Sequence, residues 1–189
     1  KTPSYLRSIP IAKALDPDFS SAAGFDRTCA SLRTGSSRQL VDDRERVAMF
    51  ICRAIGVAKD TATWFKQRGN IIDLPHSPAL RARAKHDRAA LAELRGLLEG
   101  VRGIGPFFTI EPGNWQFDFD GDGRVSLPEK YLFWIPMRGI GSNPYPVADA
   151  EETYRSRNTN LVIAIDRSDV YWAIAYLDFA EAALDIALA

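Results

Sequence analysis

The sequence predicts a mainly α fold: a single-domain helical bundle of about four or five helices with long irregular segments. At 189 residues the chain has the length of one ordinary domain. Its composition, 46% hydrophobic and 25% charged, is that of a globular protein. In three long segments apolar residues recur every three or four positions between capping residues, which is the pattern of amphipathic helices.

The first segment is expected to be irregular. Prolines and glycines recur through residues 1–35, and paired serines at 20–21 and 36–37 favour turns. We therefore divide the chain into a leader at 1–36, packed on the domain, and a helical domain at 37–189.

Two helices are expected next, over about 37–55 and 61–68. Ser36 and Gln39 have the spacing of a capping box, and Gly56 suits the position after a helix end. The shorter helix is expected to end at Gly69.

Two further long helices are predicted over about 77–99 and from 169 to the C-terminus. Ser77 is the expected cap of the former and Ser168 of the latter. The last helix is apolar around most of its circumference, which is typical of a core or interface helix. It also carries a narrow acidic stripe that we expect to meet basic residues: Asp178, Glu181 and Asp185. The apolar run 161–165 fits either a short buried strand or a helical turn.

Charge excludes some functions. The formal net charge is zero, which argues against a general nucleic-acid binder. Residues 1–105 hold 18 basic and 11 acidic residues, an excess of +7, whereas residues 106–189 hold 6 and 13, an excess of −7. We expect these halves to complement each other within the fold. No apolar run is long enough to predict a transmembrane segment.

The cysteines leave two alternatives. Cys29 and Cys52 could form a disulfide in an oxidising compartment, or remain buried thiols in a reduced one. Two cysteines and two histidines are too few for a zinc site built from those residue types alone.

The strongest motif occupies residues 118–129, Asp-Phe-Asp-Gly-Asp-Gly-Arg-Val-Ser-Leu-Pro-Glu. All twelve positions resemble an EF-hand calcium loop. The resemblance implies a Ca²⁺ site in which Arg124 contributes its backbone carbonyl and Ser126 acts through a water. Its implied metal ligands are Asp118, Asp120, Asp122, Arg124, Ser126 and Glu129.

Physical chemistry supports a cation in this loop. Calcium takes six to eight oxygen ligands, and closely spaced carboxylates repel one another without a cation. Gly123 permits the sharp turn after the third aspartate. A helix is expected over about 127–135, directly after the loop.

The loop departs from the EF-hand pattern on its N-terminal side. Pro112 and Gly113 disfavour a helix there, so the entering helix is expected to be absent or very short. A single loop without that helix resembles the structural calcium sites of exported proteins, whose calcium affinity is weak. This favours an extracytoplasmic location, periplasmic or secreted.

No complete catalytic set is visible, so an enzyme is not the favoured interpretation. Glu111, in a loop beside Trp115, is the one weak catalytic candidate, because glycosidases use such a glutamate with a second carboxylate. His76 and His86 lie in no catalytic pattern. Aromatic residues on both sides of the loop are expected to pack the core, with a glycan platform as the alternative.

These observations favour a calcium-binding exported protein with a structural calcium site, acting as an accessory or assembly subunit. The widely apolar last helix suggests a protein partner or an oligomer. The first alternative is a glycan-active, cell-wall lytic enzyme with Glu111 as general acid or base. The second is a calcium-responsive switch.

Overall fold

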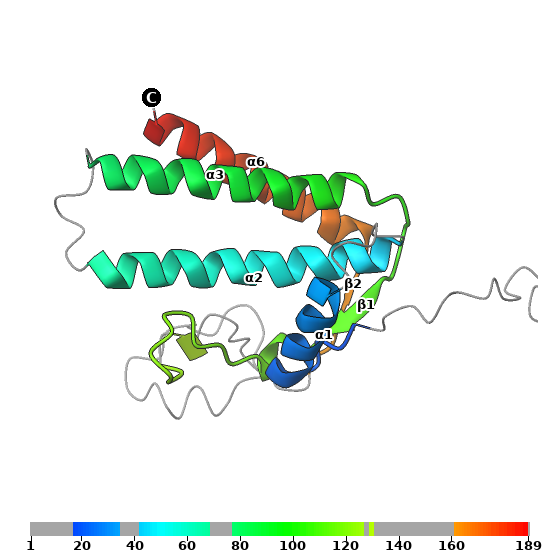
Figure 1. Cartoon of the computed structure of the whole chain (residues 1–189). Helices are drawn as coiled ribbons and strands as arrows, with labels where there is room; N and C mark the ends of the chain where they lie inside the picture. Colours follow the sequence, from blue (N-terminus) through cyan, green and yellow to red (C-terminus); the bar gives the residue numbers. More distant parts are fainter. Residues whose placement is uncertain (1–16, 35–41, 69–76, 127–128, 131–160, 189) are drawn as a thin grey trace, which may run out of the picture.

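The computed structural model describes residues 17–34, 42–68, 77–126, 129–130 and 161–188 (Figure 1). Its helices are α1 (Ala22–Thr34), α2 (Asp43–Arg68), α3 (Pro78–Glu99) and α6 (Arg167–Leu188), and its strands are β1 (Phe108–Ile110) and β2 (Ile163–Ile165). The prediction of a mainly α, single-domain fold is confirmed. Within the described part of the chain, no helix is both long and apolar enough to cross a membrane.

Helix α1 corrects the prediction that residues 1–35 are irregular. Residues 22–34 form a helix whose buried side chains, Phe25, Cys29 and Leu32, follow the four-then-three spacing of one helical face. Gly24 leaves room on this helix for the Asp18 carboxylate, which a Cβ at that position would overlap. The glycine is therefore a packing residue here rather than a helix breaker.

A disulfide joins α1 to α2 and resolves the cysteine alternatives. Cys29 and Cys52 are bonded, with their Cα atoms 5.5 Å apart. The bridge closes a loop of 23 residues between two helices that pack against each other.

Helix α2 is one continuous helix where two were predicted. Gly56 lies inside it, with no atom within 4 Å of the place where a Cβ would be. A glycine in an exposed helix interior costs only about 1 kcal/mol, which the good helix formers around it offset. The helix begins at Asp43, and the Asp42 carboxylate accepts a hydrogen bond from the Glu45 backbone N–H at 2.8 Å. The predicted Ser36–Gln39 capping box lies outside the described residues.

Helices α3 and α6 lie antiparallel, side by side (Figure 1). The Ser77 hydroxyl oxygen accepts the Leu80 N–H at 3.1 Å, so the predicted cap of α3 is confirmed. Two ion pairs join the helices: Arg88 to Asp185 at 2.5 Å and Arg95 to Asp178 at 3.0 Å. The acidic stripe thus meets basic residues at these two positions, as predicted.

The start of α6 differs slightly from the prediction. Asp166, not Ser168, caps the helix, because its carboxylate accepts the Ser168 N–H at 2.7 Å. The Asp169 carboxylate in turn accepts the Asp166 N–H at 2.8 Å. This reciprocal pair satisfies two of the backbone donors that a helix N-terminus leaves free.

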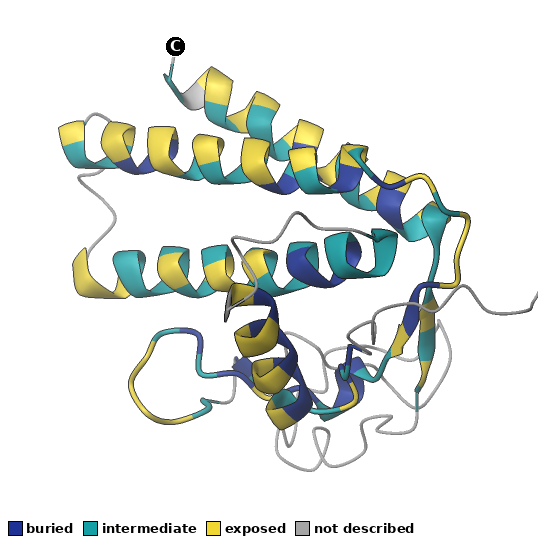
Figure 2. Cartoon of the chain, turned by 45° about the vertical axis from the view of Figure 1, so that its right-hand side comes forward, coloured by how far each residue is buried: buried dark blue, intermediate teal, exposed yellow. Residues whose placement is uncertain are grey.

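The two strands form a small antiparallel sheet at one end of the helices (Figure 1). Phe108 is opposite Ile165, and Ile110 is opposite Ile163. The apolar run 161–165 therefore contains a strand, which decides between the two alternatives left by the sequence. Phe19 bridges to Ile110 and places its ring among the core aromatics. Figure 2 shows that the buried residues concentrate where α1, α2 and this sheet meet.

Candidate metal centre

The segment leading into the acidic loop is anchored by alternating aromatic residues. Trp115, Phe117 and Phe119 are all buried. The Trp115 indole N–H donates to the Phe19 carbonyl at 2.9 Å, which fixes the start of the segment. Because successive side chains of an extended segment point to opposite sides, Asp118 and Asp120 are directed away from these aromatics. The core thus presents two carboxylates on one side of the chain.

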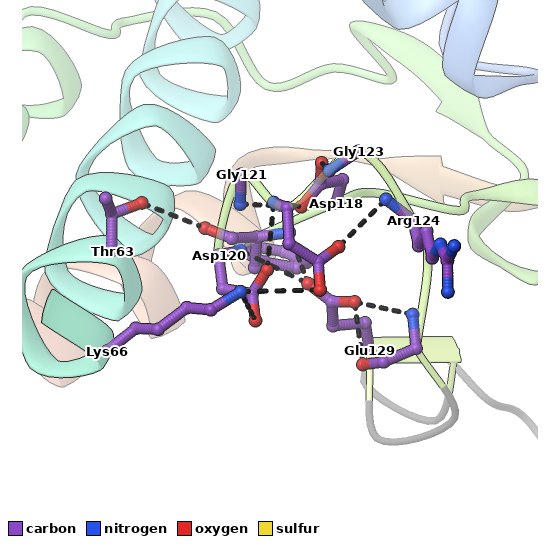
Figure 3. Close-up of polar contacts among 11 residues, drawn as sticks. Thr63, Lys66, Asp118, Asp120, Gly121, Gly123, Arg124 and Glu129 are labelled. Atoms are coloured by element: carbon purple, nitrogen blue, oxygen red, sulfur yellow. Dashed lines mark hydrogen bonds and ion pairs between the residues drawn. The ribbon is translucent and has the colours of Figure 1, made fainter. Parts of the chain in front are cut away.

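These two carboxylates meet a third from the end of the loop (Figure 3). One carboxylate oxygen each from Asp118, Asp120 and Glu129 lies within 4.8 Å of the other two. Asp118 and Asp120 are half-buried and Glu129 is buried. Three carboxylates this close create a strongly negative potential, which a cation would neutralise.

Asp118 shapes the turn between the two ends of the loop. Its Oδ1 atom accepts the Gly121 N–H at 2.6 Å, and its Oδ2 atom accepts the Gly123 N–H at 2.8 Å. Both glycines have positive φ, 74° and 83°, a conformation that residues with a side chain rarely adopt. The carboxylate therefore lies inside a ring of backbone donors at the centre of the loop.

Glu129 closes the loop from the other side. Its Oε1 atom accepts the Phe119 N–H at 2.6 Å, and its Oε2 atom accepts both the N–H and the hydroxyl of Ser126 at 2.7 Å. Burial raises the pKa of Glu129, but these hydrogen bonds to the ionised form outweigh it and lower the pKa to about 2. Glu129 is thus a buried carboxylate held in its charged form at one side of the cluster.

Helix α2 supplies a positive charge to the acidic loop. The Lys66 Nζ atom lies 2.8 Å from Asp120 Oδ2 and 3.4 Å from Asp122 Oδ2 (Figure 3). Hydrogen bonding to Asp120, ahead of that to Asp122, raises the pKa of Lys66. One turn earlier on α2, the Thr63 hydroxyl donates to the Phe119 carbonyl at 3.4 Å.

Sequence reasoning did not single out Lys66. The signal that could have found it is the spacing of Lys59, Thr63 and Lys66, which places three polar residues on one face of α2. All three contact the segment 117–122, since the Lys59 ammonium lies over the Phe117 ring at 5.0 Å.

The structure brings together three of the six predicted ligands. Asp122 is not part of the cluster, and its two carboxylate oxygens contact the Arg124 N–H and Lys66. Arg124 is exposed, and Ser126 donates its hydroxyl to Glu129. The Glu129 side chain also accepts the Ser126 N–H, as the glutamate of a capping box does.

The surroundings of the loop agree with the expected departure from an EF-hand. Before Asp118 the chain forms strand β1 and a short 3-10 turn, Pro112–Asn114, and residues 115–118 belong to no helix. After the loop, Glu129 and Lys130 are helical, and the rest of the helix predicted over 127–135 lies outside the described residues.

The weak catalytic candidate has a structural partner. The Glu111 carboxylate accepts a hydrogen bond from the Asn114 side-chain amide at 3.0 Å, within the 3-10 turn. The aromatics before the loop, Phe107, Phe108, Trp115 and Phe117, are buried, as core packing predicts. His86 is exposed, with Nε2 3.6 Å from Asp60 Oδ2, and His76 lies outside the described residues.

Comparisons of this chain with protein-family models, with curated proteins and with solved structures found no match.

Proposed function

We propose that this chain is a calcium-binding exported protein in which the loop 118–129 holds one structural Ca²⁺ ion, and that it acts as an accessory or assembly subunit. One observation carries the proposal: the carboxylate oxygens of Asp118, Asp120 and Glu129 converge within 4.8 Å of one another. Carboxylate oxygens are the ligands that calcium prefers, and the loop offers no nitrogen or sulfur ligand.

The donor set also favours calcium over magnesium. Calcium takes an irregular shell of six to eight oxygens. The loop can adjust to such a shell, because it offers two carboxylates on a glycine-rich turn and a third from its end. Magnesium demands near-ideal octahedral geometry and releases its waters reluctantly. Asp122, the Arg124 carbonyl and a water held by Ser126 would complete the proposed shell.

A bound ion would have a structural consequence at this place. Asp118 and Asp120 lie at the end of the buried aromatic segment, and Glu129 lies at the start of a helical turn. A cation shared by all three would tie these parts of the chain together. This favours a stabilising ion over a regulatory one.

The disulfide supports the exported part of the proposal. Disulfides form and persist in oxidising environments such as the periplasm and the cell exterior. Calcium concentrations there are high enough for extracellular calcium modules of weak affinity.

Calorimetric titration and thermal melts with calcium, magnesium and a chelator test the proposal. We expect one calcium site, and at 100 times Kd a bound ligand adds about 2.7 kcal/mol of stability. Asp118→Ala and Glu129→Gln should each remove most of the calcium affinity. Asp26→Asn, at an exposed acidic position on α1, is the matched control. Calcium affinity retained in both loop variants would refute the proposed site.

A further inference from the structure

The outer face of α6 is apolar, although the described chain leaves it open to solvent. Four large side chains of this face, Trp172, Tyr176, Phe179 and Ile186, are 66%, 68%, 76% and 79% exposed. Figure 2 shows exposed residues repeating along α6 toward its C-terminal end. With the small residues between them, they form what we call the α6 stripe: Trp172, Ala175, Tyr176, Phe179, Ala182, Ala183 and Ile186.

The spacing within the stripe is that of a helix-pairing seam. Positions 172, 176, 179, 183 and 186 follow an alternation of four and three, the heptad pattern by which one helix packs along another. The opposite side of α6 is already used, because Val170 and Leu177 are buried in the core. The seam is thus a second packing face of the same helix.

The stripe contains no charged residue. The acidic residues Asp178 and Asp185 lie to one side of it and are paired with Arg95 and Arg88 of α3. A surface helix normally directs its charged residues outward, whereas α6 directs them toward its neighbour. Contiguous exposed apolar surface of this kind marks an interaction site.

The order of residues makes the stripe complementary to itself. In an antiparallel pairing of two copies with Phe179 at the two-fold axis, Trp172 of one copy faces Ile186 of the other. Tyr176 then faces Ala182, so that a large side chain meets a small one. No like charges meet, because the stripe has none.

The available area suits such a pair. An aromatic side chain buries about 150–250 Å², so four large residues at these exposures offer roughly 500 Å² per copy. Two copies would bury about 1,000 Å² in total, the size at which specific interfaces begin. A membrane surface fits less well, because interfacial helices carry Lys and Arg along their polar face and α6 carries Asp178 and Asp185 there.

We propose that the α6 stripe is a homodimer interface, in which the α6 helices of two copies pair antiparallel about Phe179. The inference extends the assembly role proposed above and names its partner as a second copy of this chain. It is independent of the calcium site, because no residue of the loop belongs to the stripe.

Sedimentation equilibrium over a range of concentrations, with calcium and with chelator, tests this pairing. We expect a concentration-dependent dimer of the wild type under both conditions. Phe179→Glu should raise the dimer Kd at least about tenfold, as expected for a central aromatic residue of an interface. Ile104→Glu, the same change at a residue 79% exposed but outside the stripe, should leave the Kd unchanged. Circular dichroism of each variant checks that the helical fold is retained.

Cysteine cross-linking tests the register. The two native cysteines are bonded to each other, so an introduced cysteine supplies the only free thiol for cross-linking. Phe179→Cys should cross-link two copies on mild oxidation, whereas Ile104→Cys should not. A wild type that stays monomeric in both conditions would overturn the proposal. The stripe would then be covered by other segments of the chain or by a lipid surface. A dimer that persists with Phe179→Glu would also overturn it. Loss of calcium binding with an intact dimer would reject only the calcium proposal.

Discussion

The Lys66 ammonium lies 2.8 Å from the Asp120 carboxylate, so the C-terminal part of α2 supplies a positive charge to the acidic loop. The same ammonium reaches Asp122 at 3.4 Å. Two of the predicted calcium ligands are therefore partly neutralised by a residue of the chain itself. A cation that binds the loop has to share these carboxylates with Lys66 or displace it.

We therefore expect Lys66→Met to strengthen calcium binding. Because the ion pair is partly exposed to solvent, the gain should be modest, about twofold to fivefold in Kd. Calorimetric titration at fixed ionic strength measures it. Lys85→Met, an exposed lysine of α3, controls for the change in net charge. Calcium affinity that is equal or weaker in Lys66→Met would show that the lysine does not compete with the ion.

Asp18 makes stability depend on pH in the acid range. Hydrogen bonds from the Ser20 hydroxyl and backbone N–H, aided by the Arg27 guanidinium, lower the pKa of Asp18 below its ordinary 3.8. A lowered pKa in the folded state means that the ionised group stabilises the fold above about pH 3.8, and that this contribution is lost as pH falls through the folded pKa.

The variant Asp18→Asn should therefore be less stable than wild type at neutral pH. The difference between their melting temperatures should become smaller in acid. Melting temperatures of wild type and Asp18→Asn between neutral pH and pH 3 measure this. Asp26→Asn, at an exposed position of the nearby helix α1, serves as the control. A difference that stays constant across this range would contradict the assigned role of the Asp18 carboxylate.

Local signals explain which elements the sequence predicts well. Helix α3 begins directly after Ser77 and ends at Glu99, as predicted, because the residues that cap a helix act on their immediate neighbours in the chain. The resemblance of residues 118–129 to a calcium loop likewise predicts that Asp118, Asp120 and Glu129 lie close together, because the turn between them brings their carboxylates within reach of one another.

Tertiary contacts explain what the sequence does not predict. Helix α1 is missed because a glycine such as Gly24 usually interrupts a helix. In the structure this glycine makes room for the Asp18 carboxylate, a contact that the sequence does not reveal. Helix α2 is divided in error because Gly56 resembles a helix end, although nothing adjacent to it terminates the hydrogen bonding. Lys66 is missed because its partner Asp120 is distant in the sequence.

The disulfide between α1 and α2 should contribute substantially to stability. On the chain-entropy model, cross-linking a loop of 23 residues stabilises the fold by about 3 kcal/mol. We expect the double variant Cys29→Ala, Cys52→Ala to lose about this much in urea unfolding. Reducing the wild-type bond should cause a similar loss, and reductant should not change the variant. Equal stability of the two forms would show that the bridge does not stabilise the fold.

Trp115 should affect the stability of the fold more than the chemistry of the loop. Its indole N–H is bonded to the buried Phe19 carbonyl, three residues before the first aspartate of the loop. Trp115→Phe keeps an aromatic ring but removes this donor and some packing volume, so we expect a loss of about 1–3 kcal/mol in stability. Calcium affinity should change little below the melting transition, because Phe117 and Phe119 still direct the carboxylates outward. Urea unfolding and calorimetric titration separate the two effects. A large loss of calcium affinity in a variant that remains folded would show that the Trp115 hydrogen bond positions the loop itself.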